Sequence, residues 1–294
     1  MLNKVVISAA GLGTRLIPTT KELPKEMMPI FARESFEGLC VKPLLQLLFE
    51  QLYSLGLRNF CFIVGRGKRA IEDHFTPDYE FIKKLNNERK NKQASNLEAF
   101  YNMVKSSNMI WVNQPEPKGF GHAVLMAKPF ITDEPFLVCA GDTYVISKNG
   151  NHIKRLIETH LKYGADATLL LQQLKSLKLK GYGIAETTKV NNKVLKVKNV
   201  IEKPEKPPSN FAIMPIYVFN PVILKALEET QPGYGGEIQL TDGIQKLIDI
   251  GLNVYAVKMR RDEIRLDIGT PETYWEALNL SYKHFKKEPG YQTV

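Results

Sequence analysis

The first 175 residues alternate short apolar runs with segments of helical periodicity, and this alternation restricts the fold more than any other feature. The apolar runs cover 4–11, 59–65, 109–114, 135–142 and 166–174, and the helical segments cover 43–57, 68–75, 121–130 and 153–164. Strands of a parallel sheet are buried on both faces, so they read as continuous apolar runs. The pattern therefore predicts an α/β fold with a Rossmann-like, mostly parallel central sheet flanked by helices.

The pattern changes from about residue 180. Strand-like segments at 181–187, 193–204 and 211–220 follow one another with turns between them and no full helix. They predict an added antiparallel β layer attached to the same sheet. Helical segments return at 221–230, 237–251 and 270–285, and the polar residues 78–106 indicate a helical excursion. Because no repeat or Pro/Ser-rich linker interrupts the chain, we expect a single domain over residues 1–294.

The charge balance narrows the class of partner. The 40 basic and 31 acidic residues give a formal net charge of +9, which suits nucleic acid, anionic lipid or small anionic substrates. Basic clusters are interleaved with acids and Asn and not with aromatics, so we expect no nucleic-acid partner. No apolar stretch approaches the ~18 residues of a membrane span. Three cysteines without a CxxC pair indicate reduced thiols and a cytoplasmic location.

The stretch "SAAGLGTRLIPTTKELPKEMMP" (8–29) follows the first expected strand. Gly11-x-Gly13 begins like a dinucleotide fingerprint, but the third glycine position holds Leu16, and the chain has no P-loop pattern. Ala10 and the two glycines are small enough for a ligand to lie on the backbone, whose N–H groups can bind phosphate oxygens. A tight glycine turn, common in α/β proteins, is the alternative.

Two cations in the same stretch favour a phosphate ligand. Arg15 comes directly after the glycines, and Lys25 lies ten residues further on, between Pro24 and Glu26. Proline restricts the loop locally, which would hold the lysine in place. Two fixed cations beside a glycine loop suit a triphosphate.

Two acidic residues are candidates for a metal site. Asp142 follows the apolar run 135–142, and Asp267 follows a short apolar stretch and precedes a helix. Ligands of open α/β sheets bind outside the carboxyl ends of strands, and Mg²⁺ takes one or two carboxylates together with phosphate oxygens. Each Asp could instead stabilise a turn or cap a helix, although Thr270 is the better cap for the last helix.

These residues belong to a longer series of motifs. In chain order the motifs are "AAGLGTRLIPTTKELPKEMMP", "KPLLQ", "IEDHF", "NQPEPKGFGHAV", "AGDTYV", "GYGIAE", "VIEKPEKPPSNFAIMPIYVF", "GGEIQLTDGI" and "DIGTPETYWEA". With them, the chain resembles the bacterial-type UTP–glucose-1-phosphate uridylyltransferases, a group of the sugar-1-phosphate nucleotidylyltransferases. The resemblance implies the nucleotide-diphospho-sugar transferase fold, with residues 1–175 mainly binding the nucleotide and residues 176–294 mainly binding the sugar.

The resemblance also implies a role for each candidate site residue. The catalytic residues would be Arg15, Lys25 and Asp142. The nucleotide would be bound by Ala10, Gly11, Gly13, Thr14, Gln114 and Gly121, the last two at the uracil base. The sugar phosphate would be bound by Gly183, Glu202 and Lys203, and the metal ion, Mg²⁺, by Asp142 and Asp267.

The implied reaction converts UTP and glucose-1-phosphate into UDP-glucose and pyrophosphate. A sugar phosphate is already an oxyanion near neutral pH, so its attack on the α-phosphorus needs no general base. The reaction needs two anions held in line and their charge offset, which is the work of Lys, Arg, backbone N–H groups and Mg²⁺. The resemblance also implies a homodimer or homotetramer.

Two alternatives remain open from the sequence. "AGDTYV" is similar to the dTTP-using relatives, so the same chemistry with dTTP would give dTDP-glucose. A non-catalytic regulator that binds nucleotide sugars would be marked by loss of Lys25, Arg15 or Asp142, and all three are present. Residues 30–41, "IFARESFEGLCV", are longer than the corresponding segment of the bacterial enzymes, and we expect them to form a surface or oligomer-contact loop.

Overall fold

The computed structural model describes residues 2–34, 38–175 and 179–287. Its main sheet contains β1 (Lys4–Ala9), β4 (Asn59–Val64), β5 (Asn108–Asn113), β6 (Phe136–Ala140), β8 (Ala167–Gln173), β9 (Ile184–Lys189), β10 (Val194–Ile201), β11 (Phe211–Phe219) and β12 (Val254–Lys258). These nine strands lie in the order β5-β4-β1-β6-β11-β8-β12-β10-β9. Two small antiparallel sheets pair β2 (Pro29–Glu34) with β3 (Gly38–Pro43) and β7 (Thr143–Ile146) with β13 (Ile264–Asp267).

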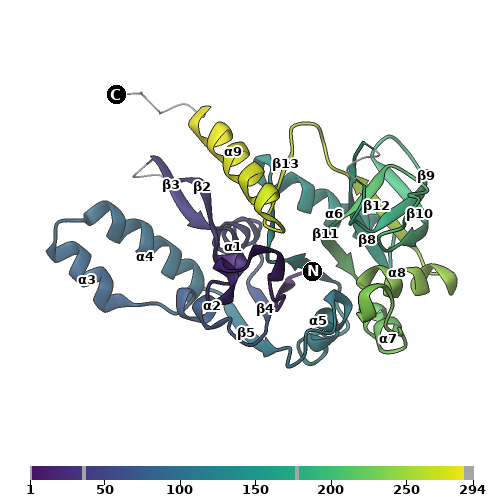
Figure 1. The fold of residues 1–294 in the computed structure, drawn as a ribbon, viewed down its shortest axis with the longest axis horizontal. Coiled ribbons are helices and arrows are strands. Elements are labelled where there is room, and N and C mark those ends of the chain that lie inside the picture. Colours follow the sequence, from purple (N-terminus) through teal and green to yellow (C-terminus); the bar gives the residue numbers. More distant parts are fainter. Residues whose placement is uncertain (1, 35–37, 176–178, 288–294) are drawn as a thin grey trace.

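Helices cover both faces of the main sheet (Figure 1). The helices of the described residues are α1 (Leu44–Ser54), α2 (Arg69–His74), α3 (Tyr79–Asn87), α4 (Asn91–Lys105), α5 (Phe120–Met126), α6 (Asn151–Lys162), α7 (Val222–Glu228), α8 (Leu240–Asp249) and α9 (Pro271–Lys287). The last helix begins as its sequence predicts, since Pro271 is its first residue and Thr270 Oγ1 accepts a hydrogen bond from Thr273 N at 3.2 Å.

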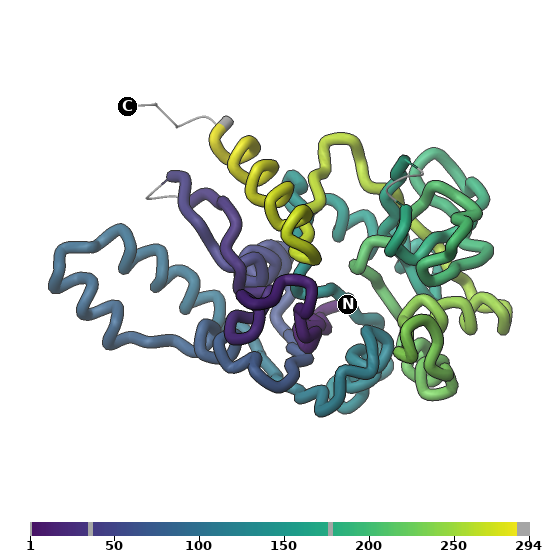
Figure 2. The backbone as a smooth tube through the Cα atoms, in the orientation of Figure 1, coloured from purple at the N-terminus to yellow at the C-terminus, as the bar shows by residue number. Residues whose placement is uncertain are grey.

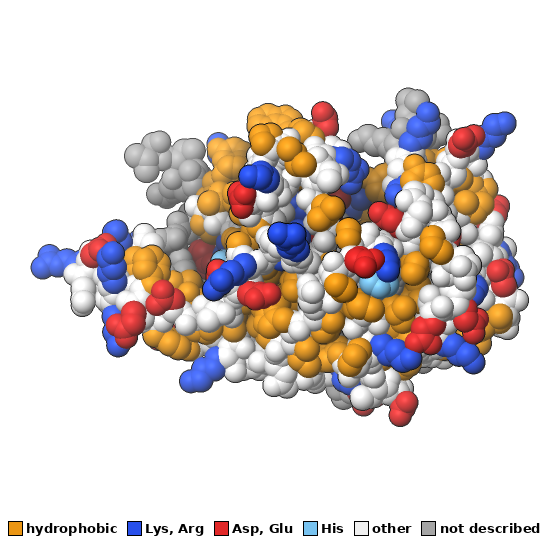
Figure 3. Space-filling model, turned by 60° about the horizontal axis from the view of Figure 1, so that its bottom comes forward, with side chains coloured by type: hydrophobic (Ala, Val, Ile, Leu, Met, Phe, Trp, Pro, Cys, Tyr) orange, Lys and Arg blue, Asp and Glu red, His pale blue; other side chains and the backbone are white. Residues whose placement is uncertain are grey.

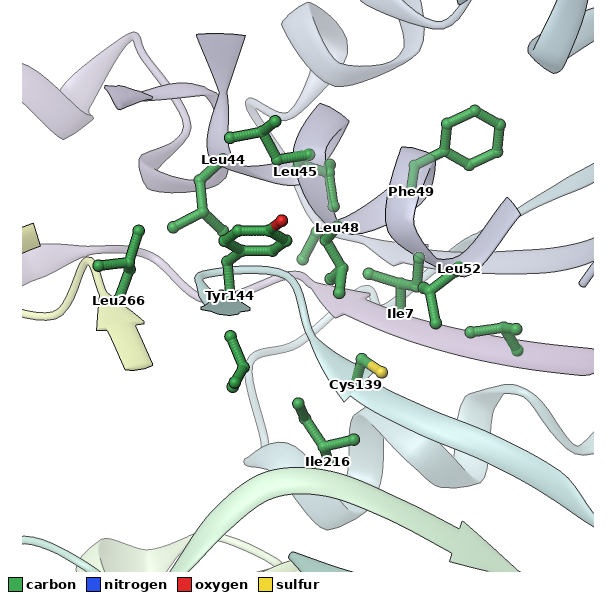
Figure 4. Packing of buried hydrophobic residues seen from close by; sticks show 14 of the residues in the cluster. Ile7, Leu44, Leu45, Leu48, Phe49, Leu52, Cys139, Tyr144, Ile216 and Leu266 are labelled. Atoms are coloured by element: carbon green, nitrogen blue, oxygen red, sulfur yellow. The ribbon is translucent and has the colours of Figure 1, made fainter. Parts of the chain in front are cut away.

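Alternate residues of the central strand β1 enter two separate hydrophobic cores. Val5 and Ile7 pack in the core beneath α1, α4 and α6, whereas Val6 packs in the core beneath α5, α7 and α8. This burial on both faces explains why the strand reads as a continuous apolar run. Figure 4 shows the first core, in which leucines of α1 lie over side chains from β1, β6 and β11, beside Tyr144 and Leu266 of the small sheet.

The main sheet is not mostly parallel, so this part of the fold prediction is wrong. Only the β5-β4-β1-β6 half and the β8–β12 pair are parallel, and every other neighbouring pair is antiparallel. The physical reason is β11, which inserts between β6 and β8 and runs antiparallel to both. The antiparallel strands after residue 180 thus enter the same sheet, as expected, but they also separate its parallel strands. The sheet is mixed.

The described residues of the segment 30–41 lie in β2 and β3, the two antiparallel strands of a β-hairpin, and not in the loop expected from the sequence. Ile30 and Ala32 of β2 are fully buried, and α9 packs along this strand, as Figure 2 shows for the yellow helix beside the purple hairpin. Tyr282 of α9 meets Phe31 edge-on, with 5.0 Å between the ring centroids. None of the described hairpin residues lines the large cleft described below. The polar segment 78–106 is the helical excursion that its sequence predicts, built from α3 and α4.

Cys61 and Cys139 are buried in the two cores, as their apolar surroundings predict, and neither forms a disulfide. No described helix is both long and apolar enough to cross a membrane. On the face drawn in Figure 3, Lys and Arg side chains are scattered among Asp and Glu. A continuous basic stripe, the usual footprint of a nucleic-acid-binding surface, is not seen among the described side chains of that face.

Buried histidines are expected to make the fold acid-sensitive between pH 6.5 and about 4. His152 is fully buried, and neither ring nitrogen has a hydrogen-bond partner among the described residues. Burial and the nearby Arg155 lower the pKa of His152 to about 3, and burial lowers the pKa of His74 to about 4. Below its ordinary pKa near 6.5 each histidine binds a proton in the unfolded chain but not in the folded one, so stability falls as pH falls.

Urea unfolding of the wild type and of His152→Leu at pH 7 and pH 5 measures this effect. Leucine leaves no polar atom unpaired, so we expect the variant to fold. The wild type should lose about 2 kcal/mol more than the variant between the two pH values, because a protonation difference is worth about 1.4 kcal/mol per pH unit. Equal losses in the two proteins would show that His152 is not responsible.

Candidate active site

A cleft of about 790 Å³ opens beyond the carboxyl ends of β1 and β6. This is the edge at which open α/β sheets bind their ligands, and the volume suits a nucleotide with a sugar. Most of the candidate residues line it, namely Gly11, Gly13, Thr14, Arg15, Lys25, Gln114, Asp142, Gly183, Glu202, Lys203 and Asp267. Ala10 and Gly121 are buried and lie behind this wall. The fold thus brings together residues from positions 11 to 267.

The glycine loop leaves β1 and forms one side of the cleft. Gly13 has φ of 66°, a left-handed conformation that strains any residue with a Cβ, and Thr20 Oγ1 donates a 2.7 Å hydrogen bond to its carbonyl. Gly11 faces Lys25, because a Cβ built on Gly11 would lie 3.7 Å from Lys25 Nζ. The loop therefore keeps its backbone open to a ligand beside the lysine.

Lys25 forms an ion pair with Asp142 at the base of the cleft. Burial alone would lower the pKa of Lys25, but Asp142, Glu26 and Asp267 outweigh it, so its pKa lies above the ordinary value. Burial would likewise raise the pKa of Asp142, but Lys25 outweighs it and holds this pKa low. The two groups are therefore charged near neutral pH, and Lys25 presents a full positive charge to the cleft.

A second, buried ion pair fixes the chain next to Lys25. Lys68 Nζ lies 2.8 Å from Glu26 Oε2, and the two side chains are only 6% and 2% exposed. Glu26 is the immediate neighbour of Lys25, in a short 3₁₀ turn over Lys25–Met27. The sequence gives one signal for this pair, a lysine directly before α2, but it does not distinguish Lys68 from exposed neighbours such as Arg69.

The two candidate metal ligands come together through the small sheet. Asp142 directly precedes β7, and Asp267 at the end of β13 pairs with Thr143, the first residue of β7. Burial and the negative charge of Asp142 raise the pKa of Asp267, against the influence of Arg265. Two carboxylates that repel one another in a cleft form a hard-oxygen donor set, which fits a divalent cation such as Mg²⁺.

The opposite wall places a second group of candidates around Glu202. Thr241 Oγ1 donates a 2.7 Å hydrogen bond to Glu202 Oε2, and a Cβ on Gly183 would come within 3.1 Å of the same oxygen. Lys203 Nζ lies 3.4 Å from Glu202 Oε1 and 4.7 Å from the centre of the Tyr234 ring. The arrangement offers a fixed carboxylate for hydroxyl groups and a cation for a phosphate.

Gln114 lines another part of the cleft. This side chain follows β5 directly, and its backbone N donates to Val64 O at 2.7 Å. Gly121 N donates to Ile238 O at 2.9 Å, and a Cβ on Gly121 would meet that oxygen at 2.8 Å. Gly121 thus allows α5 to pack closely on residues 238–239, and the structure places Gln114, and not Gly121, on the cleft wall.

Sequence reasoning assigned no role to two polar cleft residues, Thr241 and Arg265. Thr241 orients Glu202, as described above, and lies in the quoted motif "GGEIQLTDGI" without having been assigned a role. Arg265 donates a hydrogen bond to the Tyr182 hydroxyl and stacks on that ring, with Cζ 4.9 Å from its centre. The available signal for Arg265 was its spacing, since residues two apart on a strand share a face and Asp267 lies on that face.

The family model for nucleotidyl transferases matches residues 4–283. The chain belongs to the nucleotidyl transferase family. Among curated proteins it is similar to the UTP--glucose-1-phosphate uridylyltransferase of Pseudomonas aeruginosa, with 35% identity over 98% of each chain. It is also similar to the enzyme of the same name from Bacillus subtilis, with 41% identity over 85% of this chain and 81% of that protein.

Solved structures agree with this assignment. A UDP-glucose pyrophosphorylase complexed with UDP-glucose is 32% identical, with a TM-score of 0.82 over 97% of this nucleotidyl transferase and 100% of that chain. A UTP-bound enzyme from Acinetobacter baumannii is 27% identical, with a TM-score of 0.83 over 99% of this chain and 95% of that one. The expected α/β nucleotidyl transferase fold and family resemblance are confirmed.

Proposed function

We propose that this protein transfers the uridylyl group of UTP to glucose-1-phosphate and releases pyrophosphate. The observation that carries the proposal is the single cleft that joins the glycine loop, Arg15 and Lys25 to the Glu202 wall. One end of that cleft offers backbone N–H groups and cations for a triphosphate. The other end offers a carboxylate for sugar hydroxyls, with Lys203 beside it for the sugar phosphate.

In the proposed reaction an oxygen of the sugar phosphate forms a bond to the α-phosphorus of UTP. The bond from that phosphorus to the bridging oxygen breaks, and pyrophosphate leaves with the electron pair. Lys25 and Arg15 offset the negative charge that gathers around the α-phosphorus. No histidine is among the described residues that line the cleft, which suits a nucleophile that needs no general base.

Nucleotidyl transferases of this family generally use a divalent metal ion. We propose that it is Mg²⁺ and that Asp142 and Asp267 hold it, because both line the cleft and the negative charge of Asp142 raises the pKa of Asp267. When bound, the ion would neutralise phosphate charge. Asp142 and Asp267 themselves supply the negative charge that attracts the ion, and Lys25 stays charged beside them.

Pyrophosphate release tests the proposed function. The purified protein is incubated with Mg²⁺, glucose-1-phosphate and one of UTP, dTTP, CTP, ATP or GTP. We expect UTP to be used well ahead of the others. Silence with all five nucleotides would contradict the proposal, and comparable release with UTP and dTTP would keep the chemistry but broaden the nucleotide.

The curated relatives described above are named for UTP, so the dTTP alternative is not favoured. A non-catalytic regulator is not supported either, because Arg15, Lys25 and Asp142 lie together in the cleft. A homodimer or homotetramer and a cytoplasmic location stay predictions. Of the aromatic residues on α9, Trp275 is 67% exposed and is accessible to a second copy of the chain. Tyr274 and Tyr282 instead contact the β2–β3 hairpin of the same chain.

A further inference from the structure

The amide of Gln114 is held by two neighbours in the part of the cleft that is assigned to the nucleotide base. Its Nε2 lies 2.8 Å from His122 Nδ1 and 3.3 Å from Gly119 O. His122 lies on α5, one turn from the glycine that precedes this helix, so the short loop 115–119 brings both acceptors back to the end of β5. Gln114 itself is only 5% exposed, yet it lines the cleft.

The Gly119 carbonyl decides which way the amide points. A carbonyl oxygen can only accept, so the amide atom directed at Gly119 is the NH₂ group. The same NH₂ group then donates its other hydrogen to His122 Nδ1, which must carry a lone pair. Because a primary amide has two N–H bonds, both are used on protein acceptors, and Oε1 remains to accept a hydrogen bond from a ligand.

We propose that His122 is a positioning residue that fixes Gln114 Oε1 towards the nucleotide base and thereby selects a pyrimidine with a ring N–H. This inference rests on the proposed function, in which Gln114 faces the base. Uracil carries a hydrogen on N3, which an acceptor would bind. Cytosine carries a lone pair at N3, which would repel the same acceptor.

The surroundings of His122 keep its ring neutral. Burial and the nearby Lys118 lower the pKa of His122, and only Glu116 opposes them. A protonated Nδ1 would need an acceptor and would turn the amide round, so that its NH₂ group pointed at the base. Geometry and charge therefore favour the same orientation of Gln114.

Calorimetric titration with UTP and with CTP tests the proposal, because binding is measured independently of turnover. The variants are His122→Phe, which keeps a ring but has no acceptor, and His122→Asn, whose Oδ1 takes a place similar to that of Nδ1. We expect the ratio of CTP to UTP dissociation constants to fall at least about 10-fold in His122→Phe, a typical discrimination for one well-placed base contact. His122→Asn should stay within roughly threefold of the wild type.

The other results would overturn the proposal. They are an unchanged ratio in His122→Phe, an equal loss in both variants, and no preference for UTP in the wild type. If His122→Phe fails to fold, the ¹⁵N spectrum of the wild-type imidazole decides, since the proposal requires an unprotonated Nδ1 with the proton on Nε2. Turnover of the wild type with UTP is measured separately, so a failure of the proposed function would be seen as such.

Discussion

Lys25→Ala is expected to lower kcat by about 10²–10³-fold, the usual cost of removing one preorganised charge from a transition state. UTP binding should weaken much less, because the glycine loop and Arg15 remain. The reason lies in the position of Lys25, which is held against Asp142 and faces the backbone of Gly11. Pyrophosphate release gives kcat, and titration calorimetry gives the affinity for UTP.

Lys21→Ala is the matched control for this prediction. Lys21 lies in the same loop, but its side chain is 78% exposed and, among the described residues, pairs with the exposed Glu22 alone. Its removal should leave kcat within about twofold, as for most surface changes. Near wild-type turnover in Lys25→Ala would refute the catalytic assignment of Lys25. A parallel loss in Lys21→Ala would show that the loop as a whole, and not one lysine, matters.

Most secondary-structure elements could be predicted because burial leaves a periodic pattern. The strand expected at 59–65 is β4 (Asn59–Val64), and the segment expected to be helical at 153–164 overlaps most of α6 (Asn151–Lys162). Strand partners leave no such pattern, which is why the antiparallel insertion of β11 was missed. β13 has only four residues, too few to show a clear alternation, and β7 directly follows the turn at Asp142.

The residues of the candidate site also differ in whether a local sequence pattern reveals them. Gly13 could be identified because a tight turn after a strand needs glycine, and Asp142 because it ends an apolar run. Residues that act on other residues gave at most a weak signal, because a contact between distant positions cannot be read from one chain. Thr241 meets Glu202 across 39 positions, and Lys68 meets Glu26 across 42. His122 contacts Gln114 across only eight positions, and the sequence gave no sign of this contact either.

Lys68→Met is expected to lower the free energy of unfolding by about 3–5 kcal/mol at pH 8, because it leaves the buried Glu26 carboxylate unpaired. The loss should correspond to a fall in Tm of roughly 10 °C. Arg69→Met is the control. The Arg69 side chain is 89% exposed, and its Nε lies 3.8 Å from Asp73 Oδ1 in a loose surface ion pair. That variant should change stability by less than about 0.5 kcal/mol.

The pH dependence of Lys68→Met separates an unpaired charge from poor packing. Burial already raises the pKa of Glu26 against the pull of Lys68 and Lys25, and loss of Lys68 would raise it further. A buried acid with a raised pKa binds more protons folded than unfolded, so its stability contribution is present at low pH and is lost as pH rises. The deficit of Lys68→Met should therefore be smaller at pH 5 than at pH 8, as measured by urea unfolding.

The double variant Glu26→Met with Lys68→Met should recover most of the loss, because two apolar side chains leave no charge to compensate. A deficit that is the same at both pH values and persists in the double variant would mean that packing, and not charge, is what Lys68 supplies next to Lys25.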